Sequence, residues 1–446
     1  MSRMANSRPT SLTSHTVTRR GVLTTGLAAG LALAAPGFAE AVPLDPDRIR
    51  TADDPNFHPV QFLLPPPTGR KALGTTALHL VDRSRPDPTM PSGKRELMIS
   101  LWYPASVVGS APYAKYMPAR TAVEVDDAWT GEYGLALPTG TFDFLHTQTN
   151  SRVDAPMQPL PHPVVLFSPG YQYSRFVNTS QVEDLASRGY VVVTMDHTHE
   201  TPVEFPGGRF LPGVPADQLP DPAFTRTAMQ TRTADARFVL DQLERIAGGE
   251  NPDAEGNDLP PGLGAGLDLD KVGMFGFSLG GYATANTLLE DDRFGAGLNL
   301  DGTLQDDRAK GPLGEVARKG LDQPFLLFGS DNSQRTDPRK DGYDKSWAGF
   351  WDAQRGWKAN LELTGAKQKA FTDFQFVFDQ VFRAIYGEDP IISSVMIALV
   401  GSVQPYRSLY AQREYIGAFF DQALRRRPEF LLRGDSPKFP EVRFAR

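Results

Sequence analysis

The clearest chemical signal in the sequence is a serine between glycines, in Gly276-Phe277-Ser278-Leu279-Gly280. An apolar run at 272–275 precedes this motif, and a helical pattern at about 280–289 follows it. A serine on so sharp a strand-to-helix turn projects its hydroxyl above a sheet, and its neighbours two residues away must be small. We therefore interpret Ser278 as a nucleophile; the alternative is a structural glycine-rich turn.

A nucleophilic serine needs donors for the oxyanion that forms on the substrate. The helix that starts after Ser278 directs the backbone N–H of Leu279 toward that position. A second donor comes from a loop after an earlier strand. The segment 167–171 supplies such a loop, and we predict the N–H of Tyr171 as the donor. A plain strand-end turn is the alternative.

The serine also needs an acid at the end of a later strand. Asp301 directly follows the predicted strand 297–300 and precedes Gly302. The carboxyl ends of parallel strands meet at one edge of a sheet, so this carboxylate is expected beside Ser278. A turn or helix-capping aspartate is the alternative.

These side chains are positioned by alternating buried strands and helices, which are typical of a doubly wound, mostly parallel sheet. We predict an α/β-hydrolase fold over residues 96–433, with lid insertions such as the Pro- and Gly-rich segment 201–222. Residues 42–95 are expected to wrap the domain, and residues 434–446 to form a surface tail. The predicted strands are 96–103, 163–168, 190–195, 272–275, 296–300 and 324–328, and the predicted helices are 177–188, 224–246 and 280–289.

The first 41 residues have the pattern of an export signal. Arg19 and Arg20 precede a charge-free run at 21–38, which ends in the small-x-small site Ala39-Glu40-Ala41. The paired arginines with Val22-Leu23 resemble a twin-arginine signal. We expect a secreted or extracytoplasmic protein without an integral membrane segment after cleavage; an uncleaved membrane anchor is the alternative.

Composition excludes several other functions. The chain of 446 residues has no cysteine, which excludes thiolate catalysis and Cys-ligated metal sites. Its net charge of −7 argues against a nucleic-acid partner. No nucleotide-binding glycine motif is present in the right context. We expect neither a cofactor nor a metal.

Over residues 95–420 the chain resembles the plasma-type platelet-activating-factor acetylhydrolases and their bacterial secreted lipase-like relatives. The resemblance implies that Ser278 and Asp301 are catalytic and that the backbone after Gly170 forms half of the oxyanion hole. It also implies a secreted, metal-free carboxylic-ester hydrolase acting on short or oxidised acyl esters of lipids. The segments that carry it are 165–170, 184–190, 196–197, 276–281, 292–294 and 300–301.

The sequence departs from that family at the catalytic base. The family places its histidine shortly before a Phe-x-Asp-Phe stretch, which is 371–374 here, and the matching position is Gln368. All seven histidines lie at or before His199, so none follows Ser278. A glutamine amide accepts no proton near neutral pH, and loss of the triad histidine typically costs on the order of a million-fold in turnover.

Three interpretations follow. His197 or His199, just after a predicted strand, replaces the missing base; packed loop histidines are the alternative. Otherwise the oxyanion hole serves a non-hydrolytic enzyme, such as a cyclase, isomerase or lyase. The third is a catalytically dead protein that binds a lipid or a partner in the old cleft. Our leading hypothesis is an exported enzyme derived from serine ester hydrolases, with an incomplete triad and a small ester or lipid-like substrate.

Overall fold

The fold is known from a computed structural model. It describes residues 58–106, 109–131, 137–214, 221–306, 312–331 and 344–445. The predicted signal at 1–41 lies outside these residues, so the structure does not bear on it. Among the described helices, none combines the length and apolar content that a membrane span requires.

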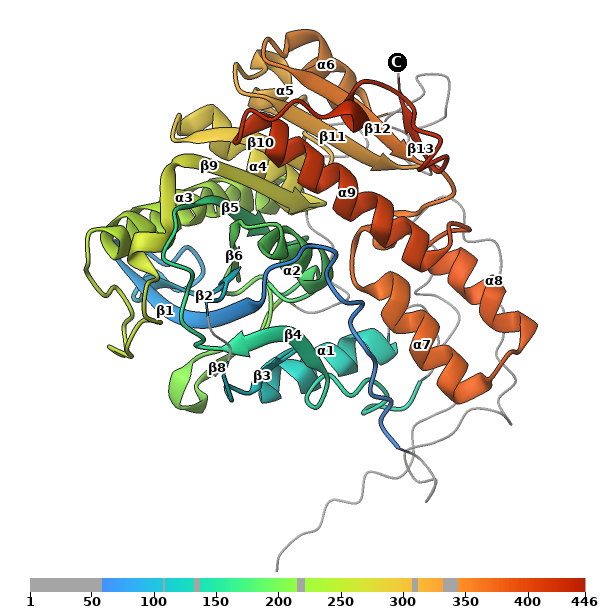
Figure 1. The fold of residues 1–446 in the computed structure, drawn as a ribbon, viewed down its shortest axis with the longest axis horizontal. Coiled ribbons are helices and arrows are strands. Elements are labelled where there is room, and N and C mark those ends of the chain that lie inside the picture. Colours follow the sequence, from blue (N-terminus) through green and yellow to red (C-terminus); the bar gives the residue numbers. More distant parts are fainter. Residues whose placement is uncertain are drawn as a thin grey trace, which may run out of the picture. The chain divides into compact units, whose positions relative to one another are not determined.

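An eleven-stranded mixed sheet organises the described residues (Figure 1). Its order is β13-β12-β11-β10-β9-β5-β6-β2-β1-β4-β3. The strands are β1 Leu73–Pro86, β2 Lys94–Pro104, β3 Tyr113–Lys115, β4 Gln148–Val153, β5 His162–Ser168, β6 Val191–Met195, β9 Leu267–Phe277, β10 Phe294–Leu300, β11 Phe325–Ser330, β12 Lys358–Leu363 and β13 Val442–Phe444.

The strands from β6 through β5, β9, β10 and β11 to β12 pair in parallel. Every residue of β5 and β6 is buried. Strands covered by helices on both faces need no polar alternation, which explains the continuous apolar runs in the sequence. The predicted α/β-hydrolase fold with a doubly wound, mostly parallel sheet is confirmed.

Helices cover both faces of the sheet. Alternate β5 residues belong to different core clusters: Val165 packs with residues of α2 and α9, whereas Val164 packs with residues of α3 and α4. In Figure 1, α9 crosses in front of the sheet. The helices are α1 Ala119–Gly131, α2 Thr179–Ser187, α3 Pro222–Ala247, α4 Leu279–Glu290, α5 Glu315–Lys319, α6 Lys345–Ala353, α7 Phe374–Tyr386, α8 Pro390–Leu399 and α9 Pro405–Ala423.

Three segments are more ordered than their sequences suggest. The stretch expected only to wrap the domain contributes β1, which pairs with β2 along its length. The expected surface tail contributes β13, which pairs with β12, and its residues Phe439 and Val442 are buried. The expected lid loop contains the hairpin of β7 (Val203–Glu204) and β8 (Phe210–Leu211), with residues 215–220 outside the described part.

Candidate active site

Ser278 lies on a strained turn between β9 and α4. Its φ of 53° and ψ of −117° lie in a region that residues with a side chain rarely adopt. Its backbone N–H donates to the Leu300 carbonyl at 2.8 Å, which ties the turn to the end of β10. The strand, turn and helix expected around this serine are therefore all present.

The glycines of the turn are required by close backbone approaches. A Cβ on Gly276 would lie 2.2 Å from the carbonyl carbon of Gly280. One on Gly280 would lie 1.9 Å from the carbonyl oxygen of Ser168, and one on Gly281 would lie 1.9 Å from Oδ1 of Asn299. A larger residue at any of the three would push apart the strand ends that place Ser278.

The carboxylate of Asp301 is fixed at the end of β10. Its Oδ1 accepts a hydrogen bond from the Ser330 backbone N–H at 2.9 Å, and both carboxylate oxygens lie 3.2 Å from the Ser330 hydroxyl. The backbone N–H of Asp301 donates to Phe328 at 2.9 Å. The side chain of Asn299 bridges the N–H and the carbonyl of Gly302, each at 2.8 Å. The neighbouring strand β11 and the Asn299–Gly302 turn of β10 thus hold this acid in place.

Gln368 opens a short 3-10 helix, Gln368–Phe371, and reaches the serine. Its Nε2 lies 3.0 Å from the backbone carbonyl of Asp301 and 3.3 Å from Oγ of Ser278. A carbonyl oxygen only accepts hydrogen bonds, so the amide must present its NH₂ group to Asp301. Oγ of Ser278 therefore receives an N–H from Gln368. The structure brings Ser278, Asp301 and Gln368 together, and the side chain at the base position is a donor.

The two histidines considered as substitute bases have other partners. His197 is buried, with Nε2 2.8 Å from Oγ of Ser168 and Nδ1 3.0 Å from Asp235. Burial, together with the positive charge of a nearby arginine, lowers the pKa of His197. Nε2 of His199 lies 3.5 Å from Asp87. Neither imidazole hydrogen-bonds Ser278.

The predicted oxyanion loop follows β5. Gly170 lies so close to the Tyr173 and Phe277 rings that a Cβ there would come within 2.8 and 3.0 Å of them. The Tyr171 ring meets Phe224 edge to face, with centroids 5.2 Å apart. Burial raises the pKa of the Tyr171 hydroxyl to about 12.

Sequence reasoning missed a buried arginine behind this loop. Arg232, on α3, donates to the carbonyls of Pro169 and Gly170 and pairs with Glu200. Its position in the sequence gives no signal, because charged residues are common on the exposed face of a helix. Only the sheet topology places this one beneath the loop.

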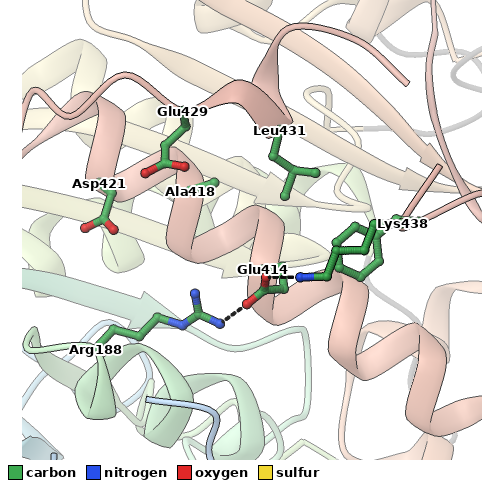
Figure 2. A pocket seen from close by; sticks show the side chains of 8 residues that line it. Arg188, Glu414, Ala418, Asp421, Glu429, Leu431 and Lys438 are labelled. Atoms are coloured by element: carbon green, nitrogen blue, oxygen red, sulfur yellow. Dashed lines mark hydrogen bonds and ion pairs between the residues drawn. The ribbon is translucent and has the colours of Figure 1, made fainter. Parts of the chain in front are cut away.

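A pocket of about 250 Å³ lies elsewhere, between the end of α2, α9 and the C-terminal segment (Figure 2). Arg188 and Lys438 both form ion pairs with Glu414 there. Ser278 is not among its described lining residues: Arg188, Glu414, Ala418, Asp421, Glu429, Leu431, Lys438 and Phe439. Within the described ranges, no group of three or more His, Asp or Glu side chains is arranged to hold a metal ion.

Comparison with known proteins identifies the family. The family model described as platelet-activating factor acetylhydrolase, isoform II, matches residues 91–203. A protein of Arthroderma benhamiae named as a probable 1-alkyl-2-acetylglycerophosphocholine esterase is 30% identical over 403 residues, which cover 86% of this chain and 94% of that protein. The chain belongs to the platelet-activating factor acetylhydrolase family.

Two further relatives extend this assignment. A platelet-activating factor acetylhydrolase of Cavia porcellus is 26% identical over 270 residues, covering 57% of this chain and 58% of that protein. The solved structure of a ferulic acid esterase from Streptomyces cinnamoneus is 34% identical, with a TM-score of 0.68, and covers 87% of this family member and all of that chain. These relatives place the chain among the carboxylic-ester hydrolases.

Proposed function

We propose that this family member is an exported enzyme that binds small-molecule esters and polarises their carbonyl group, but hydrolyses them slowly. One observation carries the proposal: Gln368 donates a hydrogen bond to Ser278 where the family's base would accept a proton. The predicted oxyanion donor after Ser278, the backbone N–H of Leu279, does not depend on that base. Substrate binding and carbonyl polarisation are therefore retained, while serine activation is weakened.

The chemistry follows from the direction of that hydrogen bond. When Ser278 attacks an ester, its hydroxyl proton must leave Oγ as the new carbon–oxygen bond forms. The Gln368 amide has no basic nitrogen to take it, and donation to Oγ withdraws electron density from the attacking oxygen. Hydrolysis then depends on solvent as the base and on stabilisation of the tetrahedral intermediate by backbone donors.

The substrate class is proposed from what the relatives' names share. One relative is named for an acetyl ester of a glycerophospholipid, and another for esters of an aromatic acid. Both contain a carboxylic ester on a small molecule. We infer that the substrate of this chain is such an ester, and a short acyl group is the natural first choice for an assay.

A fluorophosphonate probe tests the proposal directly. We expect Ser278 of the wild-type protein to be labelled on the order of 10²- to 10⁴-fold more slowly than Ser278 of Gln368→His, since a general base contributes about that factor to the rate. The measurement is the labelling rate, followed by intact-mass spectrometry, with Ser278→Ala as the unlabelled control.

The possible results separate the three interpretations of the site. Rapid wild-type labelling would mean that another group already activates Ser278. No labelling of either folded protein would reject the serine-ester chemistry and favour a binding role. Slow labelling together with serine-dependent conversion of an ester without hydrolysis would favour the non-hydrolytic alternative.

Export is a separate proposal, based on the paired arginines at 19–20 and the site that ends at Ala41. We expect N-terminal sequencing of the protein from the extracytoplasmic fraction to begin at Val42. Replacing both Arg19 and Arg20 by lysine is expected to retain the protein inside the cell, because the twin-arginine pathway reads that pair. An intact N-terminus on exported protein would contradict the cleavage prediction.

A further inference from the structure

We propose that Arg232 is a positioning residue that sets one half of the oxyanion hole by holding the loop after β5. The inference rests on the proposed ester chemistry at Ser278 and identifies the structure that supports it. The Arg232 side chain is only 1% exposed. Its Nη1 donates to the carbonyl of Pro169 at 2.6 Å, and its Nη2 donates to the carbonyl of Gly170 at 3.2 Å.

Because a peptide unit is planar, these contacts also influence the orientation of the Tyr171 N–H, the predicted oxyanion donor. The Gly170 carbonyl and the Tyr171 N–H belong to one planar peptide unit, and every described peptide bond is trans. In a trans unit the C=O and N–H point in opposite directions. The Gly170 carbonyl accepts from Arg232 and, at the same 3.2 Å, from the backbone N–H of Tyr173. Arg232 thus helps to fix this carbonyl and, with it, the direction of the Tyr171 N–H, away from the guanidinium.

The loop held by Arg232 lies against the nucleophile turn. The Cα of Gly280 approaches it so closely that an added Cβ would lie 1.9 Å from the carbonyl oxygen of Ser168 and 2.7 Å from that of Pro169. Gly280 is the residue after Leu279, whose N–H is the other predicted oxyanion donor. A small movement of the loop would therefore change the spacing between the two donors.

An acidic partner holds the guanidinium in place. Nη2 of Arg232 lies 2.7 Å from Oε2 of Glu200, and Nε lies 3.1 Å from both carboxylate oxygens. Glu200 follows β6, so the pair joins α3 to the strand next to β5. The planar guanidinium bonds the carboxylate on one side and two carbonyls on the other, which a lysine ammonium does not reproduce.

His197 supports the same arrangement. Arg232 also donates to Oγ of Ser168 at 3.1 Å, so the hydroxyl proton of Ser168 is available for Nε2 of His197, 2.8 Å away. Nδ1 of the imidazole then donates to Asp235 at 3.0 Å. This neutral tautomer satisfies every partner. The structure therefore assigns His197 to support of the loop.

The test compares two buried arginines that hold backbone carbonyls. Arg413 donates to the carbonyls of Pro65 and Pro66 and is 4% exposed, so it is a matched control outside the oxyanion loop. Arg232→Lys and Arg413→Lys are made in wild type and in Gln368→His. Hydrogen exchange of the peptide that contains residues 168–171 is measured in every variant. The kcat and KM for p-nitrophenyl acetate are measured for the two arginine variants made in Gln368→His.

We expect Arg232→Lys to speed exchange at residues 168–171 and to lower kcat by on the order of 10²- to 10³-fold, the effect of losing one oxyanion donor, with KM changed much less. Arg413→Lys should leave both readouts unchanged. Circular dichroism and urea unfolding identify folded protein, and Glu200→Gln provides a second, milder variant if Arg232→Lys does not fold.

Two results would overturn the proposal. Unchanged exchange at residues 168–171 in folded Arg232→Lys would show that the arginine does not hold the loop. Faster exchange with unchanged kcat would show that the loop does not set catalysis. Failure of the ester chemistry has a different signature, because turnover would then persist in Ser278→Ala while hydrogen exchange still reports on the loop.

Discussion

Replacing Gln368 with histidine is expected to raise kcat/KM for a short p-nitrophenyl ester by on the order of 10³-fold or more, because loss of a triad histidine costs about a million-fold in well-formed sites. The amide nitrogen of Gln368 already lies 3.3 Å from Oγ of Ser278. An imidazole at this position would place a basic nitrogen near the proton that must leave. The full factor is not expected, since neighbours packed around an amide do not orient an imidazole optimally.

The dependence of activity on pH provides an independent readout. In Gln368→His, kcat/KM should rise as the pH rises through about 6 to 7, because only the neutral imidazole accepts a proton and an ordinary histidine has a pKa of about 6.5. Wild type should show no such step, because neither His197 nor His199 hydrogen-bonds Ser278. Initial rates from pH 5 to 9 measure both profiles.

Two controls separate a new base from a general change of the pocket. Gln368→Asn removes the contact with Ser278 without supplying a base, so its activity should remain near wild type. Ser278→Ala combined with Gln368→His should lose the gain. If wild type is already as active as Gln368→His, or shows the same step near pH 6 to 7, another group serves as base and our view of the site is wrong.

The local arrangement around Ser278 can be predicted from the sequence because its constraints are local. The spacing of Gly276 and Gly280 around Ser278 follows from the turn itself, and the structure shows those close approaches. The position of Asp301 follows from the rule that parallel strands end at one edge. The Phe-x-Asp-Phe stretch at 371–374 indicates Gln368 as the residue at the family's base position, and the structure places its amide within hydrogen-bonding distance of the serine.

What the sequence does not reveal depends on contacts between distant segments. Arg232 lies 62 residues from Gly170 along the chain, and its burial results from packing of α3 against the end of β5. The strand β1 contains the polar residues Thr75 and His79, which are buried because β2 and β4 pair alongside β1 and Phe205 packs on the His79 ring. A local pattern carries no information about such partners.

Replacing Asp301 with asparagine is expected to lower kcat strongly in Gln368→His but only slightly in wild type. In Gln368→His it should lower kcat by on the order of 10⁴-fold, because a triad aspartate holds the imidazole in the reactive tautomer and stabilises its positive form. In wild type there is no imidazole to orient. The loss there should stay within about tenfold, which reflects only altered contacts around the serine.

Four proteins form a double-mutant cycle for Asp301→Asn and Gln368→His: wild type, each single variant and the double variant. Each is assayed for kcat on p-nitrophenyl acetate. Asparagine keeps an oxygen to accept the Ser330 backbone N–H, so the strand end should stay folded. Asp306→Asn is the matched control, since this aspartate bonds the Tyr282 hydroxyl rather than the catalytic turn. Equal losses in both backgrounds would mean that Asp301 is structural. A loss confined to Gln368→His would show that the acid of the triad is in place and lacks only an imidazole to act on.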